Sequence, residues 1–133
     1  MINIKYRGYT KSGLIGSPWV YNGYAINKVD YNGVSSTYIL TPYGDYIVDE
    51  NSIGQYTGLK DRNGRGIYEG DILSVYSNFY KRYFTVRVEF KYGAFVAIGD
   101  EDCIDDYRNC NLKYINNYSE IKGNIFEDEF KVV

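Results

Sequence analysis

The chain is organised around one glycine-rich segment, Ser52-Ile-Gly-Gln-Tyr-Thr-Gly-Leu-Lys-Asp-Arg-Asn-Gly-Arg-Gly-Ile-Tyr-Glu-Gly-Asp71. We call it the signature segment. It holds five glycines and no long apolar run. Gln55 to Lys60 has the composition of a short extended piece, and Asp61-Arg62-Asn63-Gly64 supplies residues that tolerate a tight turn. The signature segment therefore predicts a β-hairpin.

A second turn follows the hairpin directly. Ile67 and Tyr68 lead into Glu69-Gly70-Asp71, where Gly permits a sharp change of direction and Asp can accept hydrogen bonds from nearby backbone amides. We expect four residues of the segment to have structural roles: Gly58, Gly64, Gly70 and Asp71.

The signature segment resembles the YopX family of phage and prophage proteins. The resemblance rests on Gln-Tyr-Thr-Gly-Leu-Lys-Asp, a basic residue, Asn-Gly and Ile-Tyr-Glu-Gly-Asp-Ile, which stand at Gln55 to Ile72. It extends more weakly to Ile4 to Arg7, Trp19 to Tyr21 and Ile121 to Glu127. It implies a small, partly open C-terminal barrel of the SH3-like type, and it names no biochemical activity.

Length and charge limit the classes of protein to which the chain can belong. The 133 residues suffice for one domain or two small ones. We predict a β-rich region over residues 1–66 that ends in the signature hairpin, and a barrel with a loose tail over residues 67–133. The net charge of −2 and the pI near 5.1 argue against a general polyanion binder. The charge is +2 over residues 1–66 and −4 over residues 67–133, an asymmetry that can orient self-association.

Tyrosine dominates the aromatic residues, with 17 Tyr against 6 Phe and the single Trp19. A Tyr ring combines apolar area with a hydroxyl that needs a partner, so it suits half-buried strand faces and interfaces. We interpret the tyrosines as sheet-building residues, with stacking on an aromatic ligand as the alternative.

The chain has no histidine, and its cysteines are Cys103 and Cys110. Ser-His-Asp catalysis, Cys-His catalysis and His-ligated zinc therefore cannot be built within it. Two thiols are too few for a four-thiolate zinc site unless a symmetric oligomer shares them, so we predict no metal and no cofactor. The sequence shows no secretory h-region and no transmembrane run, which predicts the cytoplasm of a bacterial host and free thiols, although the cysteine spacing leaves a disulfide open.

Upstream of the signature segment the pattern is one of short strands and turns. Asn32-Gly33 is a strong two-residue hairpin signal, and Thr41-Pro42-Tyr43-Gly44 fits a type I turn. Asp49 to Ile53 has capping residues for a single helical turn. We expect strands on either side of Asn32-Gly33 and at residues 2–6, 19–21, 38–40 and 46–48.

Downstream, alternation predicts a barrel. Residues 84–90 place Phe84, Val86, Val88 and Phe90 on one face of a strand, and Tyr92-Gly93 turns the chain into a partner strand. With a strand after Gly70 and short strands expected at residues 112–115 and 121–126, the number of strands is that of a small barrel. We therefore predict a mainly β protein, with an N-terminal β-rich segment and a C-terminal small, partly open SH3-type β-barrel.

The turn of the signature segment, residues 60–65, which we call the signature turn, carries a candidate binding surface. Lys60, Arg62 and Arg65 can contact phosphate, and Tyr56 and Tyr68 can stack on bases. Three basic residues also suit any exposed hairpin tip, and the acidic total opposes affinity that depends on counterion release. Nucleic acid is therefore not the favoured partner.

Acidic residues supply the remaining candidates for chemistry. The run of acids over residues 100–106 can offer oxygen ligands to a cation, but it lacks the glycine and the final Glu of an EF-hand loop, which favours a solvated loop. Glu69, Asp71 and Glu89 are candidates for general acid–base work, yet nothing in their spacing brings two together. We predict that the protein is not an enzyme.

The function expected from the sequence is that of a non-enzymatic phage or prophage accessory protein. It would bind a macromolecular partner or its own copies, because short strands leave sheet edges uncovered. A homo-oligomer is the first expected partner and a host protein the second, and no membrane is expected. The alternative is a small nucleic-acid-binding barrel. The lower alternative is an inhibitor of a host defence or regulatory protein, whose acidic surface mimics nucleic acid.

Overall fold

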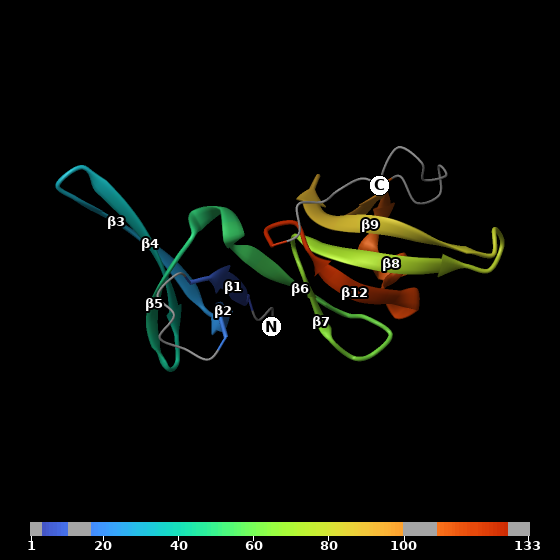
Figure 1. Cartoon of the computed structure of the whole chain (residues 1–133), viewed down its shortest axis with the longest axis horizontal. Helices are drawn as coiled ribbons and strands as arrows, with labels where there is room; N and C mark the ends of the chain where they lie inside the picture. Colours follow the sequence, from blue (N-terminus) through green and yellow to red (C-terminus); the bar gives the residue numbers. More distant parts are fainter. Residues whose placement is uncertain (1–3, 11–16, 100–108, 128–133) are drawn as a thin grey trace. The chain divides into compact units, whose positions relative to one another are not determined.

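The computed structural model describes residues 4–10, 17–99 and 109–127. The chain forms two compact units, residues 1–56 and 57–133, which we call the N-terminal and C-terminal units (Figure 1). The domain boundary predicted after residue 66 lies further along the chain and stays a prediction. Antiparallel sheets make up both units, and the helical structure of the described residues is limited to three short 3₁₀ turns. The prediction of a mainly β protein is confirmed.

The N-terminal unit is built from short strands. Its described elements are β1 (Tyr6–Tyr9), β2 (Trp19–Gly23), β3 (Ala25–Tyr31), β4 (Val34–Thr41), β5 (Gly44–Val48) and the 3₁₀ turn η1 (Glu50–Ser52). β1 pairs with β2 and with the start of β6, whereas β3, β4 and β5 form a separate antiparallel sheet. The first strand begins at Tyr6, and Ile4, which was expected in it, precedes it and is exposed.

The core of the N-terminal unit is small. Its buried hydrophobic cluster contains three residues, Val20, Ile39 and Val48. Gly8 and Gly23 face Ile39 so closely that a Cβ on Gly8 would stand 2.6 Å from Cδ1 of Ile39. The absence of side chains at these two positions lets the backbones of β1 and β2 approach β4.

The turns of the N-terminal unit follow the predicted chemistry. Asn32 and Gly33 have φ of 50° and 81°, the left-handed values that a two-residue hairpin between β3 and β4 requires. The Asp49 side chain accepts a hydrogen bond from Asn51 N at 2.9 Å and caps η1, as expected for a single helical turn.

The C-terminal unit contains a five-stranded antiparallel sheet in the order β11-β10-β9-β8-β12. Its described elements are the rest of β6 (Gly54–Lys60), β7 (Gly66–Tyr68), β8 (Asp71–Ser77), β9 (Arg82–Lys91), β10 (Ala94–Gly99), β11 (Cys110–Asn111), η2 (Leu112–Tyr114), η3 (Asn116–Tyr118) and β12 (Ser119–Asn124). The strand expected at residues 112–115 is wrong. Asn111 caps a 3₁₀ turn there by accepting from Lys113 N at 3.2 Å, and the buried Leu112 belongs to that turn.

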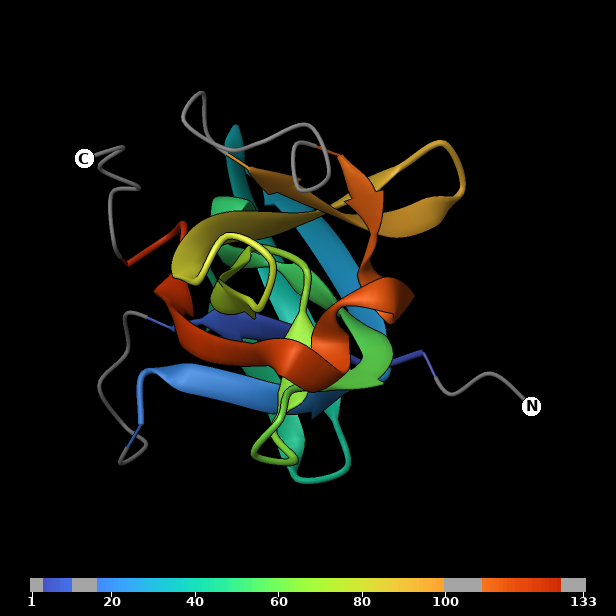
Figure 2. The same ribbon diagram turned by 90° about the vertical axis from the view of Figure 1, so that its right-hand side faces the viewer.

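The core of the C-terminal unit is larger. Among the described residues, the eight members of its buried hydrophobic cluster are Ile67, Leu73, Val75, Val86, Val88, Ala97, Leu112 and Ile115. Three of the four residues predicted to share one face of β9 are buried. The fourth, Phe90, is 52% exposed and packs edge to face on Phe95. The sheet curves around this core, as Figure 2 shows with the C-terminal unit toward the viewer. The described strands form no closed barrel, which is consistent with a partly open one, and the SH3 type stays a prediction.

Candidate binding surfaces

The turn of the signature hairpin is built around the carboxylate of Asp61, which is 4% exposed. Its Oδ1 accepts from the backbone N–H groups of Asn63 and Arg65, both at 2.9 Å, and its Oδ2 accepts from Ile121 N at 3.1 Å. Arg62 N also donates to the carbonyl of Ser119 at 2.9 Å. Asp61 therefore shapes its own turn and attaches the turn to β12.

The pKa of Asp61 lies below its ordinary value of 3.8. Burial by itself would raise the pKa, because it disfavours the charged form. The three backbone donors, from Ile121, Arg65 and Asn63, outweigh that effect, and the positive charge of Arg65 adds to them. The carboxylate is thus held ionised by the fold itself.

The turn between β7 and β8 is likewise organised by a buried aspartate. Asp71 is 1% exposed, and its Oδ2 accepts from Tyr68 N at 2.8 Å. Gly70 adopts a φ of 93°, donates its N–H to Val88 and accepts from Ile125 N through its carbonyl. Gly58 and Gly64 also have positive φ, near 80°. Gly64 and Gly70 thus lie in turns and Asp71 closes one through its side chain, whereas Gly58 lies within β6.

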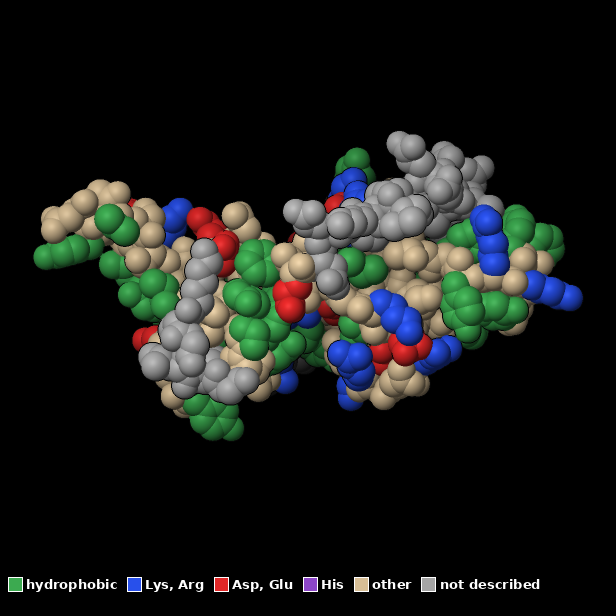
Figure 3. All heavy atoms as spheres, viewed as in Figure 1, with side chains coloured by type: hydrophobic (Ala, Val, Ile, Leu, Met, Phe, Trp, Pro, Cys, Tyr) green, Lys and Arg blue, Asp and Glu red, His purple; other side chains and the backbone are tan. Residues whose placement is uncertain are grey.

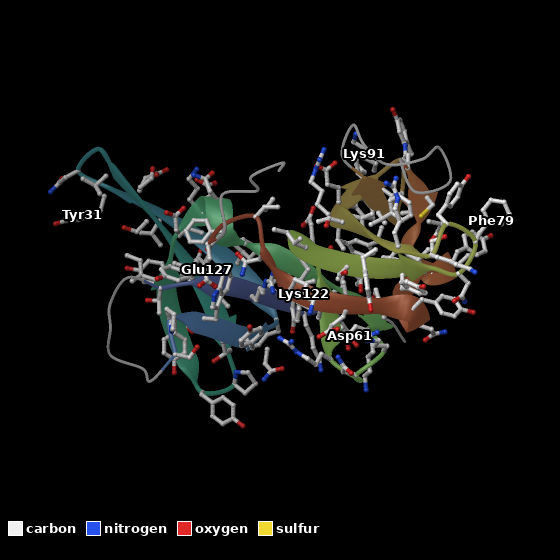
Figure 4. The ribbon with its side chains drawn as sticks, turned by 45° about the vertical axis from the view of Figure 1, so that its right-hand side comes forward. Tyr31, Asp61, Phe79, Lys91, Lys122 and Glu127 are labelled. Atoms are coloured by element: carbon white, nitrogen blue, oxygen red, sulfur yellow. The ribbon has the colours of Figure 1, made fainter. Side chains whose placement is uncertain are left out.

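The basic residues of the predicted site lie together but are partly engaged. Lys60, Arg62 and Arg65 are exposed on the signature turn. Arg62 forms an ion pair with Glu120, which also pairs with Lys122 at 3.2 Å. Figure 4 shows Asp61 and Lys122 on this side of the C-terminal unit. The hydrogen bond from Lys122 is the leading cause of the lowered pKa of Glu120.

The aromatic residues of the predicted site are less available for stacking. Tyr56 and Tyr68 are both half-buried, and Tyr56 is the last residue of the N-terminal unit whereas Tyr68 belongs to the C-terminal unit. The structure therefore gives the signature turn an exposed basic surface without an exposed aromatic platform.

Two of the three candidate acid–base residues, Asp71 and Glu89, have structural partners. Glu89 pairs with Arg87 at 2.8 Å and lies 3.8 Å from the Lys91 ammonium, while Asp71 closes its turn. The described residues contain no group of three or more Cys, Asp or Glu side chains that is suited to a metal ion. The acidic run over residues 100–106 and Cys103 lie outside the described residues, and burial raises the pKa of the Cys110 thiol.

A second surface, which the sequence interpretation missed, lies at the tip of the β8–β9 hairpin. Four aromatic side chains are exposed there, and Phe79 stands at the very tip with 85% exposure (Figure 4). The rings make two separate sets of contacts. Tyr76 lies 4.9 Å from Tyr83 between ring centroids, whereas Tyr80 lies 4.8 Å from Phe79 and 6.1 Å from the buried Phe84. We call this surface the aromatic tip, and its exposed rings are Tyr76, Phe79, Tyr80 and Tyr83.

The turn of the aromatic tip is held by hydrogen bonds, and the charged residues near it are all basic. Ser77 fixes the turn by accepting from Tyr80 N at 3.1 Å and from Lys81 N at 2.7 Å. The Arg82 guanidinium lies 4.4 Å from the centroid of the Phe84 ring. No acidic residue occurs in the sequence between Asp71 and Glu89. In Figure 3 this end of the C-terminal unit accordingly shows hydrophobic and basic side chains side by side.

A signal for the aromatic tip was present in the sequence. Asn78-Phe79-Tyr80-Lys81 connects two strands, and turns of this kind normally carry Gly, Asn, Asp or Ser because their backbone conformations favour small polar residues. Two adjacent aromatic residues in such a turn expose apolar surface to water, so they indicate a function rather than a requirement of the fold.

The N-terminal unit also has a shallow hollow of about 380 Å³. Lys5 is the only charged residue among its described lining residues, so the hollow offers no acid–base pair. Its lining is Ile4, Lys5, Asn22, Gly23, Tyr24, Pro42 and Tyr43.

Comparison with known proteins assigns the chain to a family. The family described as YopX protein matches residues 5–129, so the chain belongs to the YopX family, as its signature segment indicated. A comparison with curated proteins finds no match. Within the described residues, none of the helical turns has the length and apolar character needed to cross a membrane.

Two solved structures share the fold. The chain is similar to protein yopX from Bacillus subtilis, with a TM-score of 0.56 and 19% identity, covering 99% of this chain and 100% of that one. It is also similar to protein EF1440 from Enterococcus faecalis, with a TM-score of 0.54 and 22% identity over the whole of both chains. At this level of identity the likeness is one of fold.

Proposed function

We propose that the chain is a phage or prophage accessory protein without catalytic activity, and that it binds a macromolecular partner in the cytoplasm of a bacterial host. The observation that carries the proposal is the aromatic tip. Exposed aromatic residues in an ordered loop are typical of interaction surfaces, because they bury large area at low cost in side-chain entropy.

The chemistry of the aromatic tip favours a protein partner. Phe79 and Tyr83 can anchor in an apolar pocket, and Lys81 and Arg82 can pair with acidic side chains around that pocket. A host protein with an apolar pocket and an acidic rim is therefore the partner that fits. The absence of histidine and the structural engagement of Asp71 and Glu89 support a role without catalysis.

A nucleic-acid partner is the second candidate. Lys81 and Arg82 beside exposed rings are also what a single strand needs, since bases stack on aromatic side chains and phosphates pair with cations. Affinity of that kind falls steeply with salt, whereas an anchored apolar contact does not.

The test is capture of the tagged full-length protein from a bacterial lysate, with and without nuclease. The test variant is Phe79→Ser/Tyr83→Ser, and the control is Tyr43→Ser, because Tyr43 is as exposed as Phe79 but lies in the N-terminal unit. We expect a host protein that survives nuclease, is captured by the wild type and by Tyr43→Ser, and is lost with the double variant.

Equal capture by the double variant would refute the aromatic tip as the contact surface. Capture that nuclease abolishes for the wild type would replace the protein partner by nucleic acid.

A further inference from the structure

The outer edge of β3 is a long, uncovered strand edge. β3 lies at the end of the β3-β4-β5 sheet, and no described strand pairs with its other side. Residues 26–35 of the β3–β4 hairpin are all exposed. Figure 4 shows Tyr31 at the tip of this hairpin. An uncovered strand edge is a template for pairing with another strand.

The turn determines which backbone groups point to that edge. Tyr31 and Val34 flank the two-residue turn as opposite residues, so they form the hydrogen-bonded pair of the hairpin. Pairs alternate along an antiparallel ladder. The backbone groups of Tyr31, Val29 and Asn27 therefore face β4, and those of Ile26, Lys28 and Asp30 face outward.

The two charged residues of β3 are both at outward-facing positions. Lys28 and Asp30 are two residues apart, so they lie on one face of the strand with opposite charge. Natural edges are often protected by charges, but a protective edge repels its own copy only when the charges are alike. The edge of β3 is instead complementary to itself when a second copy runs antiparallel.

The charges select one register. With Val29 opposite Val29 of the second copy, Lys28 faces Asp30 of the second copy twice, and both are hydrogen-bonded pairs of the new ladder. A register centred on Lys28 places lysine opposite lysine, and one centred on Asp30 places aspartate opposite aspartate. A shift by one residue pairs outward-facing with inward-facing positions and loses the ladder.

The contacts that Lys28 and Asp30 make within the chain are compatible with ion pairs between the two copies. Lys28 Nζ lies 3.4 Å from Glu50 Oε1, and both side chains are more than half exposed, so water screens the pair. Ser35 donates its hydroxyl to Oδ1 of Asp30, and a carboxylate has a second oxygen for an ammonium group.

The opposite face of the hairpin is apolar. Val29, Tyr31 and Val34 share it, because Tyr31 and Val34 are directly opposite and Val29 lies two residues away. These side chains are exposed in a single copy. Pairing at β3 brings the two apolar faces side by side on a joined sheet, with Val29 at its centre.

We propose that the protein forms a two-fold dimer by antiparallel pairing of β3 with β3 of a second copy, centred on Val29, with Lys28 opposite Asp30. The dimer is independent of the aromatic tip, which belongs to the other unit.

The first test exchanges the charges and measures mass by size-exclusion chromatography with light scattering. Lys28→Asp puts acids at both positions and Asp30→Lys puts lysines at both, so we expect each to weaken the dimer about tenfold or more. The double variant Lys28→Asp/Asp30→Lys restores both pairs and regains the dimer. A mixture of the two single variants also regains it, because each complements the other.

The second test places a thiol on the two-fold axis. In a chain with Cys103→Ser and Cys110→Ser, Val29→Cys should form a disulfide-linked dimer on mild oxidation, because residues in a non-hydrogen-bonded pair have Cα atoms about 4.5 Å apart. Val34→Cys is the matched control, since Val34 is more exposed than Val29 but lies on β4, away from the axis.

Three results would each overturn the dimer: a monomeric wild type at all accessible concentrations, a double charge exchange that fails to regain the association lost in single variants, and Val29→Cys that cross-links no faster than Val34→Cys. None of these bears on capture through the aromatic tip, and Phe79→Ser/Tyr83→Ser is expected to remain dimeric.

Discussion

The two units of this chain bury apolar side chains to different extents. Among the described residues, the buried hydrophobic cluster of the C-terminal unit has eight members, and the unit adds the hydrogen-bonded carboxylates of Asp61 and Asp71. Over its described residues, the N-terminal unit encloses three buried hydrophobic residues and relies on Gly8 and Gly23 to bring its backbones together. Similar strands can therefore be stabilised by a filled core or by close backbone approach, and the second solution tolerates far less change.

The difference also concerns surfaces. A unit with a small core has most of its strands partly exposed, as β3 is, whereas a filled core supports a hairpin such as β8–β9 that carries four exposed aromatic residues at its tip. We expect the N-terminal unit to be the weaker of the two and the one that gains more from a second copy.

Truncation of the two cores should show the largest effects. Ile39→Ala removes one of three core side chains of the N-terminal unit, and Leu73→Ala removes one of eight in the C-terminal unit, each at a cost of roughly 2–5 kcal/mol. Trp19 is the single tryptophan and reports the N-terminal unit alone. We expect its fluorescence transition to shift strongly with Ile39→Ala and little with Leu73→Ala, and equal shifts would mean that the units unfold as one.

Asp61→Asn tests the polar part of the C-terminal unit. An amide oxygen can still accept from Asn63 and Arg65, but the amide nitrogen would face the N–H of Ile121, so we expect a loss of about 2–3 kcal/mol in the free energy of unfolding at pH 7. Urea unfolding measures it, and Asp45→Asn at an exposed position is the control.

The same variant has a defined pH dependence. Because the folded pKa of Asp61 lies below 3.8, its stabilisation is fully present above that value and is lost as the pH falls through the folded pKa. The stability gap between wild type and Asp61→Asn should narrow at acidic pH. A gap that is constant from pH 7 to pH 3 would contradict the role of the carboxylate charge.

Gly8→Ala tests close backbone approach in the N-terminal unit. The new methyl group would meet Cδ1 of Ile39, so we expect a cost of roughly 1–3 kcal/mol, measured by thermal unfolding followed through Trp19. Adding Ile39→Val removes Cδ1 and should restore part of the loss. If the second substitution only adds to the first, crowding is not the cause.

Arg62→Glu should have the smallest effect on stability. Its ion pair with Glu120 is exposed on the guanidinium side, and such pairs contribute little. The variant separates the basic turn from the aromatic tip: retention on single-stranded DNA at low salt that disappears with Arg62→Glu would give the signature turn a binding role, whereas unchanged behaviour leaves it structural.

Local chemistry accounts for what the sequence predicted correctly. The Asn32-Gly33 hairpin, the Asp49 cap and the Gly70-Asp71 turn depend on residues adjacent in the chain, so they could be predicted from the sequence. The third hydrogen bond of Asp61, to Ile121, joins distant segments, and no local pattern carries it. Leu112 was assigned to a strand because short apolar runs look alike in strands and in capped turns.

The candidate binding surface shows the same difference between contacts of sequence neighbours and contacts of distant segments. The positions of Lys60, Arg62 and Arg65 on one turn were predictable because the three are close in sequence. The pairing of Arg62 with Glu120 was not, since it depends on the register of a strand far along the chain. Phe79 could not be found from strand alternation, because that pattern carries no information about unusual residues in turns.

The position of β12 in the sheet has a consequence for the order in which the protein forms during translation. β8 lies between β9 and β12, so one side of β8 stays unpaired until residues 119–124 have left the ribosome. The N-terminal unit is complete long before that moment and already presents the edge of β3. Nascent chains on one polysome could therefore meet through β3 while their C-terminal units are still being made.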